Sequence, residues 1–395
     1  MAGAGQRAGT LTLVAMGLAA AVQAQTYTVL HRFKFTGGGD GGYPSGVLVL
    51  DAAGNIYGTA GSGGATQSGI VFMLDKTGHE TVLHRFSGPD GSGPYAGLTF
   101  DSAGYLYGTT YYGGSSNEGV VFKLDPTTGT ETVLHDFPVS YYDGVYPYGG
   151  VTLDSAGNIY GTTEWGGLLD LGTVFALDPT GTETMVYDLN RDGGMWPWSG
   201  VILDSEGNIY GTAPGAQGPG GAPHPLPGVV FKLSPTGTFT SLYDFKGAND
   251  GLWPFAGVIG DSGGNLYGTT YAGGIAQGKA GYGTVFKLDT SGALTVLHRF
   301  SGGADGANPY SGVIQDAAGN LYGATYYGGS GYGVVFKLDT NGKETVLYTF
   351  KGGADGANPF AGLVMDSAGN LYGTTYYGGI GKGSAGFGVV FKITL

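Results

Sequence analysis

The feature that most constrains the fold is a 14-residue motif that recurs seven times along the chain. Its last copy, at residues 366–379, reads DSAGNLYGTTYYGG, and successive copies start 50 to 57 residues apart. Self-similarity at such a period is the signature of a repeat architecture, so we expect one closed array of similar units rather than unrelated domains. The copies begin at Asp51, Asp101, Asp154, Asp204, Asp261, Asp316 and Asp366.

Each repeat contains four apolar runs, which we name strands A, B, C and D. In the first repeat they read GVLVLD, NIYGT, IVFMLD and TVLHRF, and short turns rich in Gly, Asn and Asp connect A to B and C to D. Such turns join antiparallel strands into hairpins, so the 83 glycines indicate many turns rather than disorder. Four antiparallel strands per repeat are typical of a propeller blade, whereas a β-helix has a much shorter repeat.

The strand order also predicts how the array closes. A copy of strand D precedes the first strand A, and the last repeat ends after strand C. We therefore predict an all-β fold, a seven-bladed β-propeller with four antiparallel strands per blade, whose last blade is completed by residues 27–33. The predicted domain spans residues 25–395, and its blades start near residues 46, 97, 150, 200, 257, 312 and 362.

The first 24 residues have the pattern of a secretory signal. Arg7 supplies a positive charge, residues 11–22 form an apolar stretch too short to span a bilayer, and Val22-Gln23-Ala24 fits a small-x-small cleavage site. We therefore predict a mature chain that begins at Gln25 and is secreted or periplasmic. The alternative is a membrane anchor that is never cleaved.

Composition excludes several classes of function. The net charge is −13, only 12% of residues are charged, and no basic run occurs, so we do not expect nucleic-acid binding. The sequence has no cysteine and no later membrane span, P-loop, dinucleotide fingerprint or nucleophile elbow. We therefore expect no cofactor, no span in the mature chain and a monomer.

Loop length separates the two faces of the predicted propeller. The A–B and C–D turns are short and uniform, whereas the B–C loops and the crossovers from D to the next A are longer and vary between repeats. In a propeller with strand A at the axis, the variable loops share one face. Binding residues usually lie on variable loops over a rigid scaffold, so this face is the candidate functional face.

The crossovers carry a DG..P motif followed in six of seven copies by an aromatic residue. One interpretation is architectural: Asp caps a turn, Gly allows positive φ, Pro stiffens the link and the ring fills the gap between blades. The other is a ring of sugar-binding pockets. A Ca²⁺ site is a further alternative, but each copy offers one carboxylate where such ions take 6–8 oxygens. The residues after Pro are Ser45, Tyr95, Tyr148, Trp198, Phe255, Tyr310 and Phe360.

Three B–C loops read TYYGG, and their tyrosine pairs suit the flat faces of sugars, although packing between blades is the slightly favoured explanation. These tyrosines are Tyr111, Tyr112, Tyr326, Tyr327, Tyr376 and Tyr377.

Strand D carries histidine in four copies and tyrosine in the other three. This interchange favours packing or a hydrogen bond over metal ligation, and histidines in separate blades cannot converge. We therefore predict no metal site at His31, His84, His135 and His298.

The repeat departs most from its consensus in blades three to five. All four tryptophans lie there, namely Trp165, Trp196, Trp198 and Trp253. Glu164 and Asp170 enter the B–C loop of blade three, Arg191 the next crossover, and His224 the proline-rich loop of blade four. A polar and aromatic cluster in one sector of a symmetric scaffold indicates a site. Drift of unconstrained loops is the alternative.

Two catalytic schemes fit these residues. Glu164 and Asp170 could form an acid/base pair for glycoside cleavage. His224, Arg191 and a tyrosine could remove a proton next to a uronic carboxylate.

The combination GVVFKLD, ETVLH and DSAGNLYGTT resembles the GloVer tandem repeat of secreted bacterial proteins, and the resemblance covers nearly all of the predicted mature chain. It implies an exported protein with a propeller fold. It implies no catalytic residues, because no activity is established for the family.

We therefore predict a non-catalytic binding module whose ligand is a glycan or another surface molecule. The alternatives are a secreted polysaccharide lyase or glycoside hydrolase with its site in blades three to five, and a purely structural surface protein.

Overall fold

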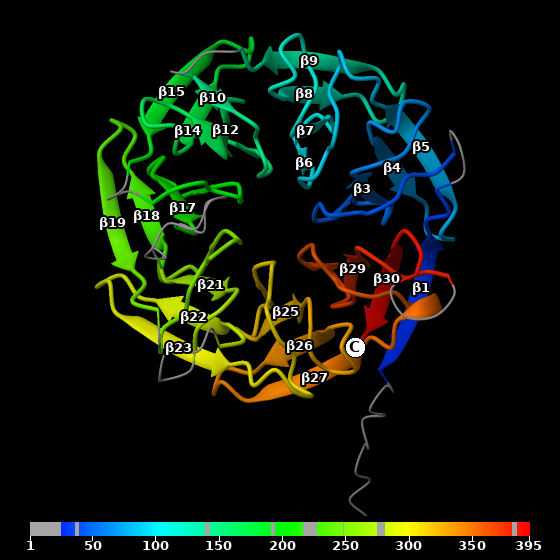
Figure 1. Ribbon diagram of the computed structural model, residues 1–395, viewed down its shortest axis with the longest axis vertical. Coiled ribbons are helices and arrows are strands. Elements are labelled where there is room, and N and C mark those ends of the chain that lie inside the picture. The colour runs from blue at the N-terminus through cyan, green and yellow to red at the C-terminus, as the bar shows by residue number, and fades with distance from the viewer. Residues whose placement is uncertain are drawn as a thin grey trace, which may run out of the picture.

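The computed structural model describes residues 25–35, 39–138, 143–190, 194–215, 227–247, 249–274, 281–380 and 385–395. Its strands form seven blades around a central axis (Figure 1). Each blade is an antiparallel four-stranded sheet in the order A, B, C, D, so the predicted seven-bladed propeller is confirmed. The predicted signal segment lies outside the described residues.

Strand A is the innermost strand of each blade and has only two residues (Figure 1). The backbones of neighbouring blades meet just before it, where a Cβ added at Gly46 or Gly200 would lie 2.3–2.4 Å from a backbone oxygen of an adjacent blade. Glycine therefore permits the close approach at the axis. These strands are β2 (Val49–Leu50), β6 (Thr99–Phe100), β11 (Thr152–Leu153), β16 (Ile202–Leu203), β20 (Ile259–Gly260), β24 (Ile314–Gln315) and β28 (Val364–Met365).

Strand B is almost fully buried and has glycine at its centre. A Cβ at this position would lie 2.5–2.7 Å from the tip of a phenylalanine ring on strand C of the same blade, so the glycine makes room for the ring. The strands are β3 (Ile56–Ala60), β7 (Leu106–Thr110), β12 (Ile159–Thr163), β17 (Ile209–Ala213), β21 (Leu266–Thr270), β25 (Leu321–Thr325) and β29 (Leu371–Thr375).

Strand C reads as a nearly continuous apolar run because both of its faces are covered by neighbouring blades. Its phenylalanine is fully buried in every blade. The strands are β4 (Ile70–Leu74), β8 (Val120–Leu124), β14 (Thr173–Leu177), β18 (Val229–Leu233), β22 (Thr284–Leu288), β26 (Val334–Leu338) and β30 (Val389–Thr394).

Strand D forms the rim, and each C–D pair contains a register shift that bends the outer strand. The N-terminal strand β1 (Thr26–Arg32) pairs with β30, so it completes the last blade as predicted. The other D strands are β5 (Glu80–Arg85), β9 (Glu131–Asp136), β15 (Glu183–Asp188), β19 (Phe239–Asp244), β23 (Leu294–Arg299) and β27 (Glu344–Thr349).

Adjacent blades are joined by phenylalanine pairs and by threonine hydrogen bonds. At six junctions the phenylalanine after strand D meets strand C of the next blade edge-to-face, as in Phe86–Phe122, with centroids 5.2–5.4 Å apart. Nearer the axis, threonines of strand B donate to carbonyls of the next blade, as in Thr59 to Ala96 at 2.8 Å. The core is therefore a ring of hydrophobic clusters, each shared by two blades.

The start of the repeated motif folds the A–B turn. Asp51 accepts hydrogen bonds from the backbone and side-chain nitrogens of Asn55, at 2.8 and 2.7 Å, and from the Tyr57 hydroxyl at 3.1 Å. Five other copies repeat all three bonds. DSAGN.Y is therefore a self-contained turn.

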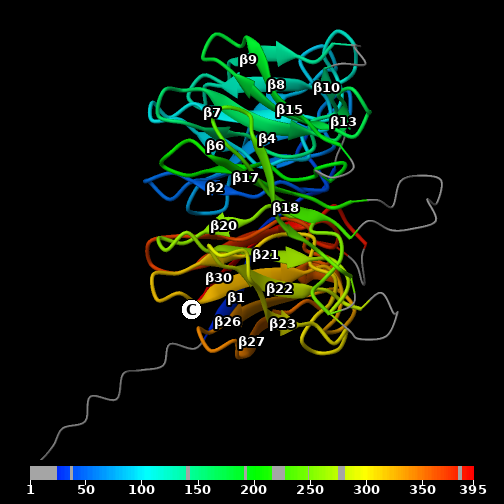
Figure 2. The same cartoon turned by 90° about the vertical axis from the view of Figure 1, so that its left-hand side faces the viewer.

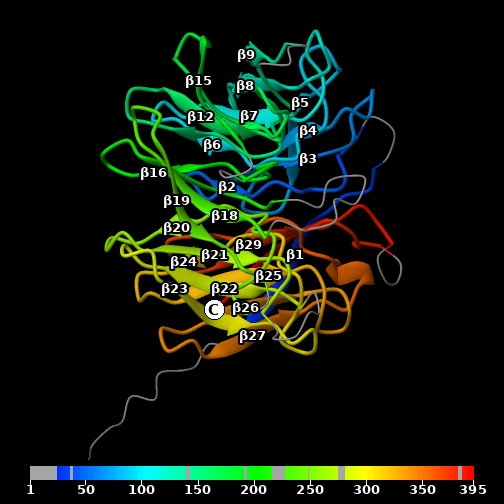
Figure 3. The same ribbon diagram turned by 60° about the vertical axis from the view of Figure 1, so that its left-hand side comes forward.

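The side views in Figure 2 and Figure 3 show the strands running between two faces of the ring. A small extra sheet of β10 (Gly144–Val145) and β13 (Trp165–Gly166) lies on the face where the longer loops gather (Figure 2). The one helical element among the described residues is the 3₁₀ turn η1 (Gly353–Asp355). No helix in the described part of the chain is long and apolar enough to cross a membrane.

Candidate functional site

The aromatic residues of the crossovers form a stacked wall around the axis. Five consecutive pairs of rings, each from neighbouring blades, have centroids 4.7–5.8 Å apart and planes inclined by 16–33°. The wall starts at Tyr95 and ends at Phe360, and Ser45 occupies the seventh position. All seven residues line a central cavity of about 220 Å³. The ring at this position therefore packs on the rings of the neighbouring blades, as the architectural interpretation requires.

Tyrosines of the B–C loops support this wall from outside. The first tyrosine of each pair packs against the wall, as Tyr326 does against Tyr310 at 5.1 Å. The second stands nearly perpendicular to the first, and it is 40% exposed at Tyr112 and 45% exposed at Tyr327. Tyr376 and Tyr377 follow the same arrangement, with a 4.8 Å separation. The two tyrosines of a pair thus have different roles.

Blades one, three and four lack the inner tyrosine of this supporting layer, and blade one has Gly61 in its place. Glu164 takes the place of the inner tyrosine in blade three, and Pro214 takes it in blade four. Because proline leaves unfilled the space that a tyrosine ring occupies elsewhere, a cavity of about 340 Å³ opens beside the wall. It shares Trp198, Phe255 and Tyr310 with the central cavity.

The structure brings all four tryptophans and Glu164 together around this cavity, which we call the tryptophan cavity. Its lining is Glu164, Trp165, Trp196, Trp198, Pro214, Gly215, Trp253, Phe255, Tyr271 and Tyr310.

Among the described residues that line the cavity, Glu164 is the only one with a charged side chain. Its Oε2 accepts a hydrogen bond from the Tyr111 hydroxyl at 2.6 Å, and its Oε1 accepts one from Trp198 Nε1 at 3.0 Å. Burial, followed by the hydrogen bond to Glu164, raises the pKa of Tyr111, so this hydroxyl remains a donor. Each carboxylate oxygen has a second lone pair, so Glu164 can still accept a bond from a ligand.

Trp165 and Trp196 face each other across the loops of blades three and four, with ring centroids 5.4 Å apart. The indole Nε1 atoms of Trp196 and Trp253 are buried, and neither has a hydrogen-bond partner in the described part of the chain. A buried donor without a partner is costly and calls for an explanation. The cavity itself offers one charged acceptor and aromatic faces.

Trp196 and Trp253 also have left-handed backbone conformations, with φ of 53° and 57°. The residue before the proline has positive φ in every crossover, and three blades place Gly93, Asn308 or Asn358 there. Glycine and asparagine adopt this conformation at low cost, whereas a bulky residue is strained. Two further blades have Tyr43 and Tyr146 at this position, so four blades keep an aromatic side chain there despite the strain, which favours a role for these side chains.

Of the other predicted catalytic residues, the one in the described part of the chain does not line this cavity. Asp170 accepts a hydrogen bond from the backbone nitrogen of Gly166 at 2.9 Å and does not line the cavity. Arg191 and His224 lie outside the described residues. Glu164 and Asp170 thus have separate partners.

Two features of the site were missed by sequence reasoning. Pro214, which has no aromatic ring, lines the cavity where four other blades carry a tyrosine, and Tyr111 from blade two donates a hydrogen bond to Glu164. Aligning the seven B–C loops position by position, with Gly61, Tyr111, Glu164, Pro214, Tyr271, Tyr326 and Tyr376 in one column, would have shown both.

A ring of four-stranded blades with a cavity among its variable loops defines a β-propeller with a candidate binding site. The family model of the Gloeobacter/Verrucomicrobia repeat matches residues 2–148, 138–277 and 228–395. The chain therefore belongs to this family, and the predicted resemblance is confirmed. No curated relative matches the chain.

Solved structures with a similar fold include two lyases. Virginiamycin B lyase from Staphylococcus aureus has a TM-score of 0.60 and 15% identity, over 94% of this chain and 99% of that chain. Oligogalacturonate lyase from Vibrio parahaemolyticus has a TM-score of 0.58 and 11% identity, over 94% of each chain.

A third similar structure is the extracellular domain of a one-component system from B. thetaiotaomicron, with a TM-score of 0.57 and 14% identity. The match covers 94% of this chain and 42% of that chain. At such identities these three structures show a shared fold alone.

Proposed function

We propose that this propeller is a non-catalytic module that binds a neutral glycan in the tryptophan cavity. The observation that carries the proposal is the set of four tryptophans and one carboxylate around a cavity of about 340 Å³. Nothing in the blade architecture requires these residues, because the other blades form the same strands without them.

The chemistry of the cavity suits a sugar. Indole faces pack against the C–H faces of a pyranose ring, while sugar hydroxyls both donate and accept hydrogen bonds. Glu164 can accept a hydrogen bond from a sugar hydroxyl. A carboxylate in the lining and a chain charge of −13 oppose acidic sugars.

A lyase or hydrolase remains the second candidate, because two lyases share the fold. The described lining offers a single carboxylate, and both of its oxygens already accept hydrogen bonds from the wall. A glycosidase needs a pair of carboxyl groups flanking the bond. The described residues therefore favour binding over catalysis.

The test is a glycan array followed by calorimetry with oligosaccharides derived from cellulose, xylan and laminarin. We expect binding to one neutral class and at least about tenfold weaker binding, about 1.4 kcal/mol, in Trp165→Ala. Tyr105→Ala is the matched control, since Tyr105 is 36% exposed on the A–B turn of the opposite face.

Other outcomes separate the alternatives. The protein would be an enzyme if it released unsaturated or hydrolysed products from polygalacturonate or another polysaccharide and if Glu164→Gln abolished this release. No binding to any glycan would leave the purely structural role.

Export is part of the same proposal, with cleavage before Gln25. Strand β1 begins at Thr26, so this cleavage would leave the closing strand complete. Mass spectrometry of the protein secreted by a bacterial host should give a chain that starts at Gln25, and a retained residue 1–24 segment would contradict it.

A further inference from the structure

A second set of polar side chains recurs at the rim, away from the tryptophan cavity. It lies where strand D of one blade meets the crossover and strand D of the next. His31 Nε2 lies 3.7 Å from Asp40 Oδ2 and 3.8 Å from Glu80 Oε2. One imidazole and two carboxylates, contributed by two adjacent blades, thus converge on one point, and their ligand atoms all lie within 4.8 Å of one another.

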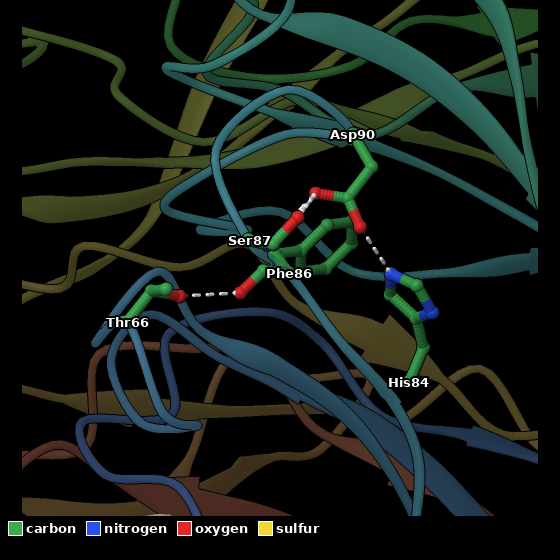
Figure 4. A network of polar contacts seen from close by, with 5 residues as sticks. All are labelled: Thr66, His84, Phe86, Ser87 and Asp90. Atoms are coloured by element: carbon green, nitrogen blue, oxygen red, sulfur yellow. Dashed lines mark hydrogen bonds and ion pairs between the residues drawn. The ribbon is translucent and has the colours of Figure 1, made fainter.

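The next junction repeats the cluster with His84, Asp90 and Glu131. Figure 4 shows the His84 ring directed at the Asp90 carboxylate, whose other oxygen is held by Ser87. His84 Nε2 and Asp90 Oδ2 are 3.0 Å apart. Asp90 is therefore positioned by its own turn, independently of the histidine.

Two further junctions carry the same residue types. His135 Nε2 lies 3.4 Å from Glu183 Oε2, and Asp143 is close enough for its charge to act on the pKa of both side chains. His298 Nε2 lies 3.6 Å from Asp305 Oδ2, and the charge of Asp305 acts on the pKa of Glu344. Among the described residues, one histidine and two carboxylates bring their ligand atoms within 4.8 Å of one another in two of these four groups, His31–Asp40–Glu80 and His84–Asp90–Glu131.

At the other three junctions, the histidine and the glutamate are both replaced by other residues. Where strand D has tyrosine, the next blade supplies a side chain without charge: Tyr187 stacks on Phe239 at 4.8 Å and Tyr348 on Tyr27 at 3.7 Å. Tyr243 similarly shares a cluster with Leu294. At this position of the next strand D, glutamate thus occurs only where the preceding strand D carries histidine, and the two residues are 46 to 49 positions apart in the sequence. The buried carboxylate is therefore paired with the imidazole and is not required by the blade.

Several atoms of these clusters lack partners. His31 Nε2, Asp40 Oδ1 and Glu80 Oε1 are buried without a hydrogen bond among the described residues, and the Asp40 side chain is only 10% exposed. The Nε2 atoms of His135 and His298 are in the same situation. Separations of 3.4–3.8 Å are too long for good hydrogen bonds. Two atoms that each bind one ion at about 2.1 Å lie at most about 4.2 Å apart, so a shared cation fits these separations.

We propose that the two complete His–Asp–Glu clusters are divalent-cation sites that tie adjacent blades together at the rim. Imidazole with two carboxylates suits Zn²⁺ or a similar first-row ion. Burial, and then the neighbouring aspartate, raises the pKa of Glu80 and Glu131 to about 7, which reflects the cost of two carboxylates in one place. A bound cation removes that cost.

The comparison of strand D histidines in the sequence did not reveal this arrangement. It correctly indicated that the histidines do not meet one another, but each meets carboxylates of its own crossover and of the next blade. The signal was the matched change of His and Glu between repeats.

The experiment measures cation content and spectra. Protein stripped with a chelator is dialysed against Co²⁺ or Zn²⁺, and the bound metal is counted by elemental analysis. We expect two ions per chain, Co²⁺ ligand-field bands, and a higher melting temperature with metal. Glu80→Gln should remove one ion, whereas Glu206→Gln, at an exposed A–B turn, should remove none.

Glutamine resembles the protonated glutamate, so a merely structural role predicts that Glu80→Gln keeps both stability and metal content. If this variant does not fold, Glu131→Gln tests the neighbouring cluster in the same way. Absence of bound metal, or a metal content that neither variant changes, would overturn the proposal.

Discussion

At the scale of the residue, the strained positions are the most informative. Trp196 and Trp253 have positive φ where Gly93, Asn308 and Asn358 take the same conformation at lower cost. Strain of this kind costs of order 1–3 kcal/mol and persists where the side chain serves another purpose. The side chains of these two residues line the tryptophan cavity.

Trp253→Asn separates the backbone from the side chain. We expect the free energy of unfolding to stay the same or to rise by about 1 kcal/mol, because asparagine accepts positive φ. Glycan affinity should fall at least about tenfold. Urea unfolding and calorimetry measure the two quantities. A large loss of stability with unchanged binding would show that the indole is needed only for packing.

At the scale of the element, the A–B turn explains why its motif is the most repeated. One aspartate satisfies the turn backbone, an asparagine and a tyrosine, so each residue of DSAGN.Y has a structural role. The function of TYYGG could not be read in the same way, because its two tyrosines face different surroundings that only the neighbouring blades determine.

These turns predict how stability depends on acid. Burial alone would raise the pKa of Asp51 and Asp366, but hydrogen bonds from Asn55 and Asn370 and their neighbours outweigh it and lower the pKa. A carboxyl whose folded pKa is lowered contributes stability above its unfolded pKa and loses it as pH falls through the folded pKa.

We therefore expect the urea midpoint to drop steeply as pH falls below about 4, the ordinary aspartate pKa. The Asp366→Asn variant should show a shallower drop and a lower stability at neutral pH. Equal acid sensitivity in both proteins would contradict the assignment.

At the scale of the whole molecule, the period and phase of the repeat predicted seven blades and the closing strand. These follow from local patterns that recur in every copy. The tryptophan cavity could not be predicted to the same extent, because it depends on Pro214, which fills less space than the tyrosine that four other blades carry at this position. The rim clusters could not be predicted either, because they bring His31 and Glu80 together from two different blades.

Ring closure should dominate global stability. Removing residues 25–33 deletes β1 and the buried Phe33, which exposes the edge of β30 and the Phe72 side of the next blade. We expect a chain that aggregates or unfolds without cooperativity. Light scattering measures the aggregation, and circular dichroism measures the unfolding. A monomeric, cooperatively folded truncation would contradict the role of β1.

The most direct test of the account is the glycan affinity of Pro214→Tyr, measured by calorimetry with the neutral oligosaccharide that binds best to the natural protein. This substitution restores the tyrosine that other blades carry and fills the tryptophan cavity without removing any lining ring. We predict an intact fold with binding at least about tenfold weaker. Unchanged affinity in a folded Pro214→Tyr protein would show that the ligand does not enter this cavity.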